Sequence, residues 1–350
     1  MTESRILART RAGVGHLTLN RPGALNALDL GMIRDLTAAL EGWRHDPEVR
    51  VILLDGAGER GLCAGGDVRT LYDEIVAGRP EETGIFFREE YRLNALISDF
   101  PKPVVAIADG ITMGGGIGLA GHASIRVVTE RSRLAMPETR IGFAPDVGGT
   151  WLLAHAPGRL GEYLGLTGAT MNAADAVYTG FADIVVPSER LDHLAMGLAE
   201  IEPSSLRTEV DARWGMRPDA SDLKGARAWI DEAFAADSVA EIVARLRALH
   251  VPQASNVADT LETLSPTGLA ATLAAVRRAR QLPDLHSALA QEYSVVMWFA
   301  TSQPDLVEGI RAQLVDKDRT PRWNPPAIAD VGPEVAASAL AYRPSVPLWG

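Results

Sequence analysis

The sequence has a single cysteine, Cys63, among its 350 residues, and this scarcity excludes several classes of protein. One thiol cannot form an intramolecular disulfide and cannot supply the ligands of a cysteine-based zinc cluster. We therefore expect a reducing, cytosolic setting. The chain also has no uninterrupted run of the roughly 18 to 20 apolar residues that a membrane-spanning helix needs.

Positive charge is scarce as well. Lys and Arg total 34 against 45 Asp and Glu, which gives a formal net charge of -11 at pH 7. Nucleic acids and anionic membranes are bound through broad basic faces, so we expect neither as a partner. A small anionic ligand held by a few local Arg or Lys side chains is compatible with this composition. The hydrophobic content of 47% is enough for a sizeable core in one large domain or two of ordinary size.

Several common catalytic signatures are absent. The seven histidines show no H-x-H or H-E-x-x-H spacing, which argues against a histidine metal site. No G-x-S-x-G segment is present, so a serine hydrolase of the usual α/β type is not indicated. Cys63 has no adjacent histidine, and we interpret it as a small buried residue.

The pattern along the chain predicts an α/β core followed by helices. Up to about residue 203, short β runs such as 14–20 alternate with helical stretches, which favours repeated ββα or βα units. We take the Arg-containing N-terminus as mature sequence, because it lacks the apolar core of a secretory signal. Helical patterns dominate afterwards, over 237–250, 267–282 and 286–302. We therefore divide the chain into a core, 1–203, and a C-terminal helical region, 204–350, as an appendage or a small second domain.

Two glycine-rich segments, 63–67 and 113–118, each lie between an expected strand and an expected helix. Backbone N–H groups at such helix starts have no intrahelical partner, and two of them converging on one point would stabilise a developing oxyanion. The alternative is that these glycines only permit tight turns and close helix–strand packing. Gly116, Gly118 and Gly121 also match a G-x-G-x-x-G dinucleotide fingerprint, but a single match of this kind is a weak signal.

Two acids, Glu138 and Asp146, stand in the otherwise apolar, Gly- and Pro-containing stretch 135–149, and each directly follows a proline. Apolar neighbours disfavour ionisation, so we expect raised pKa values that suit a general base or acid near neutral pH. Alternatively, Glu138 caps a helix and Asp146 is a turn residue. The charged run at 86–94 by itself indicates a solvated helix face.

These segments, in this order, resemble the crotonase (enoyl-CoA hydratase/isomerase) superfamily. The resemblance rests on LNRPGALNAL, GLCAGGDVR, PKPVVAIADGITMGGGIGL and MPETRIGFAPDVGGTWLL. Within the superfamily, the sequence is similar to the 3-hydroxyisobutyryl-CoA hydrolase branch. That similarity rests on FFREEYRLN, the Asp in PDVGG, LTGATMNAADAVYTGFADIVV, LSPTGL and EGIRAQLVDKDRTPRWNP. Together the motifs cover the chain from about residue 14 to about residue 327.

The resemblance implies a role for each matching residue. The amides of Gly66 and Gly115 would form the oxyanion hole for an acyl-CoA thioester carbonyl. Glu138 falls on the catalytic carboxylate that many hydratases share, and Asp146 on the second acid of the hydrolase branch. Glu90 falls on a substrate-binding position of the same branch, which moves it away from the solvated-face interpretation.

The resemblance also separates hydrolysis from hydration. Crotonase-type hydratases carry their other catalytic Glu at position 118, which is Gly here. Adding water across a double bond needs an acid and a base around that bond, so this departure disfavours a hydratase. The implied reaction is hydrolysis of a short 3-hydroxyacyl-CoA, 3-hydroxyisobutyryl-CoA in valine breakdown, to the free acid and CoA. An enoyl-CoA hydratase or isomerase and a non-catalytic acyl-CoA-binding subunit stay open as alternatives.

The implied fold is a spiral of ββα units with a helical C-terminal region. That region closes over the core or over a neighbouring subunit in superfamily members, which commonly form trimers or pairs of trimers. A homo-oligomer is therefore open, as is a C-terminal segment that covers the protein's own site. CoA enters as part of the substrate, so we expect no metal and no other cofactor. Arg21 is a candidate contact for the CoA phosphates.

Overall fold

The computed structural model describes residues 4–349, and the chain divides into two compact units made of interleaved segments. The first unit combines the chain up to residue 66 with residues 92–135 and 170–222, and the second combines 67–91, 136–169 and the residues from 223 onward. The predicted division at residue 203 stays a prediction. The interpretation of the N-terminus as mature sequence falls partly on residues 1–3, which lie outside the described residues.

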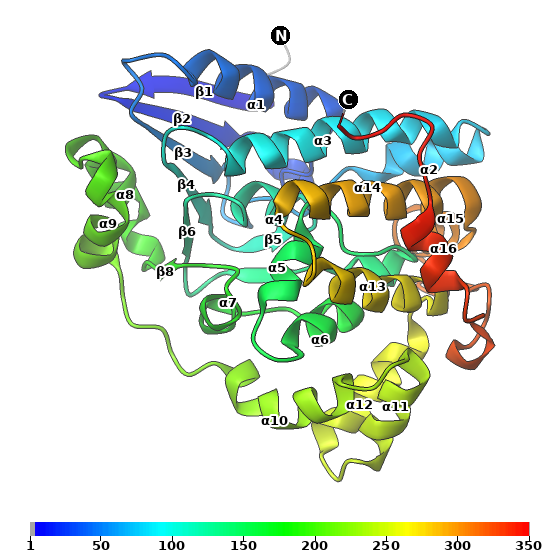
Figure 1. The fold of residues 1–350 in the computed structure, drawn as a ribbon. Helices are drawn as coiled ribbons and strands as arrows, with labels where there is room; N and C mark the ends of the chain where they lie inside the picture. Colours follow the sequence, from blue (N-terminus) through cyan, green and yellow to red (C-terminus); the bar gives the residue numbers. More distant parts are fainter. Residues whose placement is uncertain (1–3, 350) are drawn as a thin grey trace. The chain divides into compact units, whose positions relative to one another are not determined.

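The first unit is built on a six-stranded sheet in the order β1-β2-β3-β4-β6-β8 (Figure 1). Its first two strands pair antiparallel and all other neighbours pair parallel. The strands are β1 (Ile6–Arg11), β2 (Val14–Leu19), β3 (Val51–Gly56), β4 (Val104–Ala108), β6 (Ile125–Val128) and β8 (Ile184–Val185). The expected strand at 14–20 is confirmed as β2, whereas β1 was not expected. It is an edge strand with mostly exposed side chains after its first residue, so it has no alternating apolar pattern.

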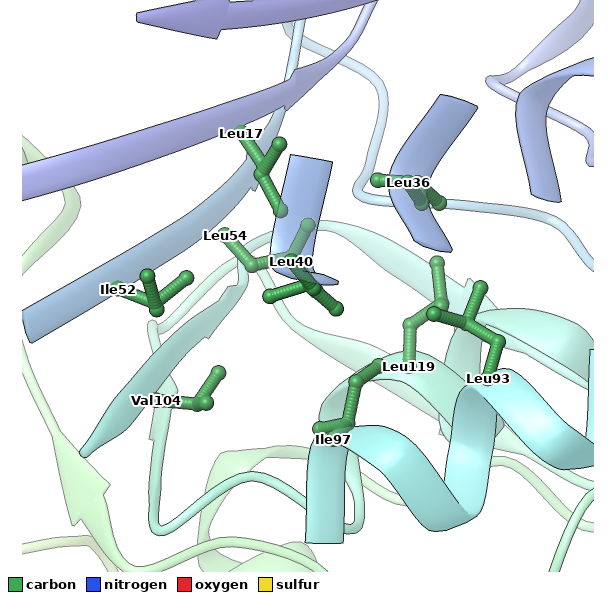
Figure 2. Close-up of a pocket in the computed structure, with 9 residues that line it drawn as sticks. All are labelled: Leu17, Leu36, Leu40, Ile52, Leu54, Leu93, Ile97, Val104 and Leu119. Atoms are coloured by element: carbon green, nitrogen blue, oxygen red, sulfur yellow. The ribbon is translucent and has the colours of Figure 1, made fainter. Parts of the chain in front are cut away.

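One face of this sheet packs on helices within the same unit. Asp29 caps α1 (Leu30–Trp43), because its side chain accepts a hydrogen bond from the Met32 amide at 2.9 Å. Side chains of α1, of the C-terminal part of α3 (Thr83–Ser98) and of α4 (Gly115–Ala120) meet those of β2, β3 and β4 around a small apolar cavity (Figure 2). Its lining residues are Leu17, Leu36, Leu40, Ile52, Leu54, Leu93, Ile97, Val104 and Leu119.

A second sheet makes the repeat a ββα one. Strands β5 (Ile111–Met113) and β7 (Arg133–Ala135) pair parallel, and single bridges extend this layer on both sides. The bridges join Leu28 to Gly66, Cys63 to Thr112 and Leu134 to Met171. Successive turns of the chain thus place one segment in the large sheet and the next in the small one. The first unit also holds α7 (Ala173–Thr179), α8 (Leu191–Gly197) and α9 (Leu206–Trp214).

The second unit is helical. Its helices are α2 (Val68–Val76), the N-terminal part of α3, α5 (Gly149–His155), α6 (Leu160–Thr167), α10 (Asp222–Phe234), α11 (Val239–Ala248), α12 (Pro252–Thr263), α13 (Pro266–Ala279), α14 (Leu285–Ser302), α15 (Asp305–Ile310) and α16 (Val335–Ala341). The helices expected over 237–250, 267–282 and 286–302 correspond to α11, α13 and α14 (Figure 1). Between residues 4 and 349, no helix combines the length and the apolar character needed to cross a membrane.

Two of the motifs on which the resemblance to the hydrolase branch rests meet inside the second unit at Asp305, which is buried. The Ser265 hydroxyl from LSPTGL donates to one carboxylate oxygen of Asp305 at 2.5 Å. The Asn324 amide from the late motif donates to the other oxygen at 2.8 Å. Through Asp305, these two motifs join the start of α13 to the segment that precedes α16. Neither motif contains a predicted site residue.

Candidate active site

Gly66 and Gly115, the two predicted oxyanion donors, lie on neighbouring segments of the first unit. The Met113 amide donates to the Cys63 carbonyl oxygen at 3.0 Å. A Cβ atom at Gly116 would lie 2.5 Å from that same oxygen, so only glycine permits this approach. Among the described residues, neither the Gly66 nor the Gly115 amide donates a backbone hydrogen bond. Both N–H groups are therefore free of backbone partners there, as an oxyanion hole requires.

The loop before the first glycine-rich segment is fixed by Asn26, which is fully buried. Its Nδ2 donates to the carbonyl oxygens of Ala57 at 3.1 Å and Gly61 at 3.2 Å, and its Oδ1 accepts from the Arg21 amide at 2.9 Å. The Arg21 guanidinium donates to the Ala27 carbonyl oxygen at 3.1 Å, within the loop that carries Asn26. The LNRPGALNAL motif thus shapes this loop, and contact of Arg21 with CoA phosphates stays a prediction.

The second unit holds the predicted acids Glu90, Glu138 and Asp146. Glu90 lies on α3, Glu138 is the first residue of the 3-10 helix η3 (Glu138–Ile141), and Asp146 lies in the loop before α5. Their exposed fractions are 2%, 7% and 6%. Glu90 is therefore not on a solvated helix face. One oxygen of Glu90 and one of Glu138 are buried without a hydrogen-bond partner among the described residues, and a bound polar group would satisfy them.

Burial raises the pKa of all three acids. For Asp146 burial raises the pKa to about 7, against the hydrogen bond from Tyr91, which lowers it. For Glu138 burial and then the charge of Asp146 raise the pKa well above its usual value. For Glu90 burial, then Asp146 and then Glu138, raise the pKa in the same direction. Carboxyl groups that keep protons near neutral pH can take part in proton transfer there.

Aromatic side chains pack against one another on the segments that carry these acids, with Phe87 and Tyr91 on α3 beside Glu90 and Phe143 between Glu138 and Asp146 in sequence. Within the second unit, the rings of Phe87 and Phe143 stack with their centroids 5.9 Å apart, and Phe143 meets Phe299 edge-on at 5.5 Å. Tyr91 meets Tyr293 edge-on at 6.3 Å. Apolar packing of this kind excludes water from nearby carboxylates and disfavours their charged form.

Two further residues contact this site, and the sequence did not single them out. The Tyr91 hydroxyl donates to the Asp146 carboxylate at 2.7 Å. Tyr91 follows Glu90 directly, so the FFREEYRLN motif already pointed to its position. Glu292 of α14 accepts hydrogen bonds from the backbone just after Asp146. It lies in a stretch that reads as an ordinary buried helix, and no spacing in the sequence indicates it. Within residues 4–349, no group of three His, Cys, Asp or Glu side chains is arranged to hold a metal ion.

Comparisons with known proteins agree with this architecture. The sequence profile described as enoyl-CoA hydratase/isomerase matches residues 14–340, and the chain belongs to this family. A solved structure named a carnitinyl-CoA dehydratase, from Mycobacterium thermoresistibile, is 45% identical with a TM-score of 0.93 and covers 99% of this chain and 98% of that one. An enoyl-CoA hydratase from Rhodobacter sphaeroides 2.4.1 is 43% identical with a TM-score of 0.89, covering 97% and 98%. The crotonase fold is thereby confirmed.

The relationship is also specific to one branch. The 3-hydroxyisobutyryl-CoA hydrolase, mitochondrial, of Gallus gallus is 38% identical over 341 residues, which span 94% of this chain and 86% of that protein. The chain therefore belongs with the 3-hydroxyisobutyryl-CoA hydrolases, as the branch motifs predicted.

Proposed function

We propose that this protein hydrolyses 3-hydroxyisobutyryl-CoA, a short 3-hydroxyacyl-CoA thioester, to 3-hydroxyisobutyrate and CoA. The observation that carries the proposal is the buried acid Asp146, whose pKa burial raises to about 7. Position 118, where hydratases of the superfamily have their second acid, is Gly118 inside the buried helix α4. The second acid of this chain is thus Asp146, on the loop that the hydrolase branch uses.

In the proposed mechanism, the amides of Gly66 and Gly115 polarise the thioester carbonyl and stabilise its oxyanion. Glu138 attacks the carbonyl carbon, the C–S bond breaks to release CoA thiolate, and water then hydrolyses the mixed anhydride to the free acid and the Glu138 carboxylate. Alternatively, Glu138 takes a proton from a water that attacks the carbonyl carbon directly and displaces the thiolate. Asp146 orients the water or donates a proton to the departing CoA thiolate. Glu90 accepts a hydrogen bond from the 3-hydroxyl group of the substrate.

Glu138 and Asp146 can take different roles in the reaction. Like charges in a shared apolar environment do not ionise together easily, so one carboxyl of such a pair keeps its proton while the other is charged. The raised pKa of Glu138 has this origin in part, since burial and then the charge of Asp146 raise it. One acid can therefore serve as base or nucleophile while the other donates.

The proposal includes the setting of the reaction. CoA arrives within the substrate, so no metal or other cofactor is required. We place the reaction in valine breakdown, in the cytosol, with Arg21 on the CoA phosphates and the chain as a homo-oligomer, a trimer or hexamer. The Gallus gallus relative is named a mitochondrial protein. Cell fractionation and light scattering test the location and the oligomer.

A panel of acyl-CoA thioesters, with released CoA thiol as the readout, tests the proposed activity. We expect 3-hydroxyisobutyryl-CoA to be the preferred substrate. Glu138→Gln should lower turnover by roughly two orders of magnitude or more with an unchanged circular dichroism spectrum, because it removes the base or nucleophile. Gly115→Pro should abolish turnover, because proline has no amide hydrogen to donate. Near-normal thiol release by Glu138→Gln would contradict the mechanism.

A second candidate is the hydration or isomerisation of an enoyl-CoA with a single carboxylate; the solved structure from Rhodobacter sphaeroides 2.4.1 is named an enoyl-CoA hydratase. Loss of the conjugated enoyl absorbance of crotonyl-CoA without thiol release would select it. A non-catalytic acyl-CoA-binding subunit would bind both thioesters and turn over neither.

A further inference from the structure

The loop that carries Asp146 contains a strained turn. The Gly149 amide donates to the Asp146 carbonyl oxygen at 2.6 Å, and the two residues between them have positive φ, +54° at Val147 and +79° at Gly148. These are the φ signs of a type I′ turn, whose first central position favours Asn, Asp or Gly. A β-branched residue rarely adopts this conformation, so it persists only where the surroundings impose it.

Glu292 supplies contacts that impose it. One carboxylate oxygen accepts from the Gly148 amide at 2.6 Å. The other accepts from the Thr150 amide at 2.8 Å and from the Thr150 hydroxyl at 2.5 Å. All three partners are donors, so a carboxylate fits and a primary amide does not, because its NH₂ group would face an N–H or O–H. With an exposed fraction of 1%, Glu292 makes these bonds away from solvent, where they are strongest.

Asp146 is thus held from two directions within the second unit. The Tyr91 hydroxyl bonds its carboxylate, and Glu292 bonds the backbone two and four residues further along. Burial raises the pKa of Glu292, the hydrogen bonds from Thr150 and Gly148 lower it, and the charge of Glu292 in turn raises the pKa of Glu138. The same side chain therefore contacts the turn and influences the ionisation of the neighbouring acid.

We propose that Glu292 is a positioning residue for thioester hydrolysis, which holds the strained turn at Val147 and so directs the Asp146 carboxyl group. The catalytic part of this inference rests on the proposed function. The restraint on the turn does not, because it needs no substrate.

The test compares Glu292→Gln with Glu162→Gln. Glu162 is an equally buried acid of the same unit, but it bonds Arg280 and Arg159 and not the turn. In Glu292→Gln we expect kcat for thiol release to fall at least about tenfold, or about 1.4 kcal/mol in barrier, with KM within about threefold. The pH profile of kcat should move to lower pH, because the pKa of Glu138 falls when the nearby negative charge is lost. Glu162→Gln should leave the position of that profile unchanged.

Hydrogen exchange without substrate provides the readout that does not depend on activity. We expect the amides of residues 146–150 to exchange faster in Glu292→Gln than in the wild type, relative to the rest of the chain, and to be unchanged in Glu162→Gln. Wild-type exchange in this segment, or faster exchange with kcat and pH profile unchanged, would overturn the inference. Absence of thiol release by the wild type would refute the proposed function alone. Thr150→Val, which removes one of the bonds, carries the same test if Glu292→Gln does not fold.

Discussion

Replacing Tyr91 with Phe should raise the pKa of Asp146 without disturbing its packing. The substitution removes a hydroxyl that donates to the Asp146 carboxylate at 2.7 Å. It keeps the ring, whose centroid lies 6.0 Å from that of Phe87 and 6.3 Å from that of Tyr293. A hydrogen bond to a charged group contributes about 1.5–3 kcal/mol, and one pKa unit is about 1.4 kcal/mol. The pKa of Asp146, which burial raises to about 7, should therefore rise by roughly a further 1 to 2 units.

The pH dependence of kcat/KM for thiol release is the assay, because it reports the essential groups of the free enzyme. The lost hydrogen bond favours the charged form, so its removal moves the titration of Asp146 to higher pH. If Asp146 acts as a carboxylate that orients water, the acidic limb of the profile moves to higher pH. If Asp146 acts as the proton donor, the alkaline limb moves to higher pH, and activity persists there. The limb that moves therefore assigns the role of Asp146.

Tyr342→Phe is the matched control. Its hydroxyl accepts a hydrogen bond from the Thr301 hydroxyl at 2.9 Å, and it is not among the groups that shift the pKa of Asp146. We expect this variant to reproduce the wild-type profile. A Tyr91→Phe profile within about 0.3 pH units of the wild type, or one displaced to lower pH, would refute the assignment of Asp146 as the titrating acid.

Two further predictions concern stability. The free energy of unfolding should fall as pH rises from about 4 to about 7, by up to about 1.4 kcal/mol per pH unit from Asp146 alone. The sign follows because native Asp146, with a pKa of about 7, keeps a proton that its unfolded form has already lost. Urea unfolding across this range measures it, and a rise in stability would contradict the assignment. Separately, Leu54→Ala beside the apolar cavity should lower the free energy of unfolding by about 2–5 kcal/mol. Thiol release per folded molecule should be unchanged. A loss of stability below about 1 kcal/mol would mean that the neighbouring side chains close the space left by Leu54.

The sequence was sufficient where a residue's surroundings are local. Glu138 and Asp146 stand among apolar neighbours, and that neighbourhood alone predicted burial and raised pKa values, as the structure has them. Helical periodicity likewise predicted α13 and α14, because one face of each helix packs against the interior.

The sequence was insufficient where a contact joins distant segments. Glu292 bonds backbone amides of Gly148 and Thr150, and a backbone donor leaves no trace in residue type. The sequence did not predict strand β1 for a different reason. This strand is held by its pairing with β2 and not by burial of its own side chains. The charges at 86–94, taken by themselves, wrongly predicted a solvated position for Glu90. This side chain is buried, although the run of charges around it is typical of an exposed helix face.

The burial of Cys63 has a practical consequence. Its side chain is fully enclosed, with its carbonyl oxygen bonded to Met113, so a thiol reagent added to the folded protein has no cysteine to reach among the described residues. Colour developed by such a reagent during an assay therefore counts released CoA directly, with no background from native protein. Once the chain unfolds, the same cysteine becomes accessible and adds one equivalent per molecule. A single colorimetric reagent thus distinguishes turnover from denaturation in every variant described above.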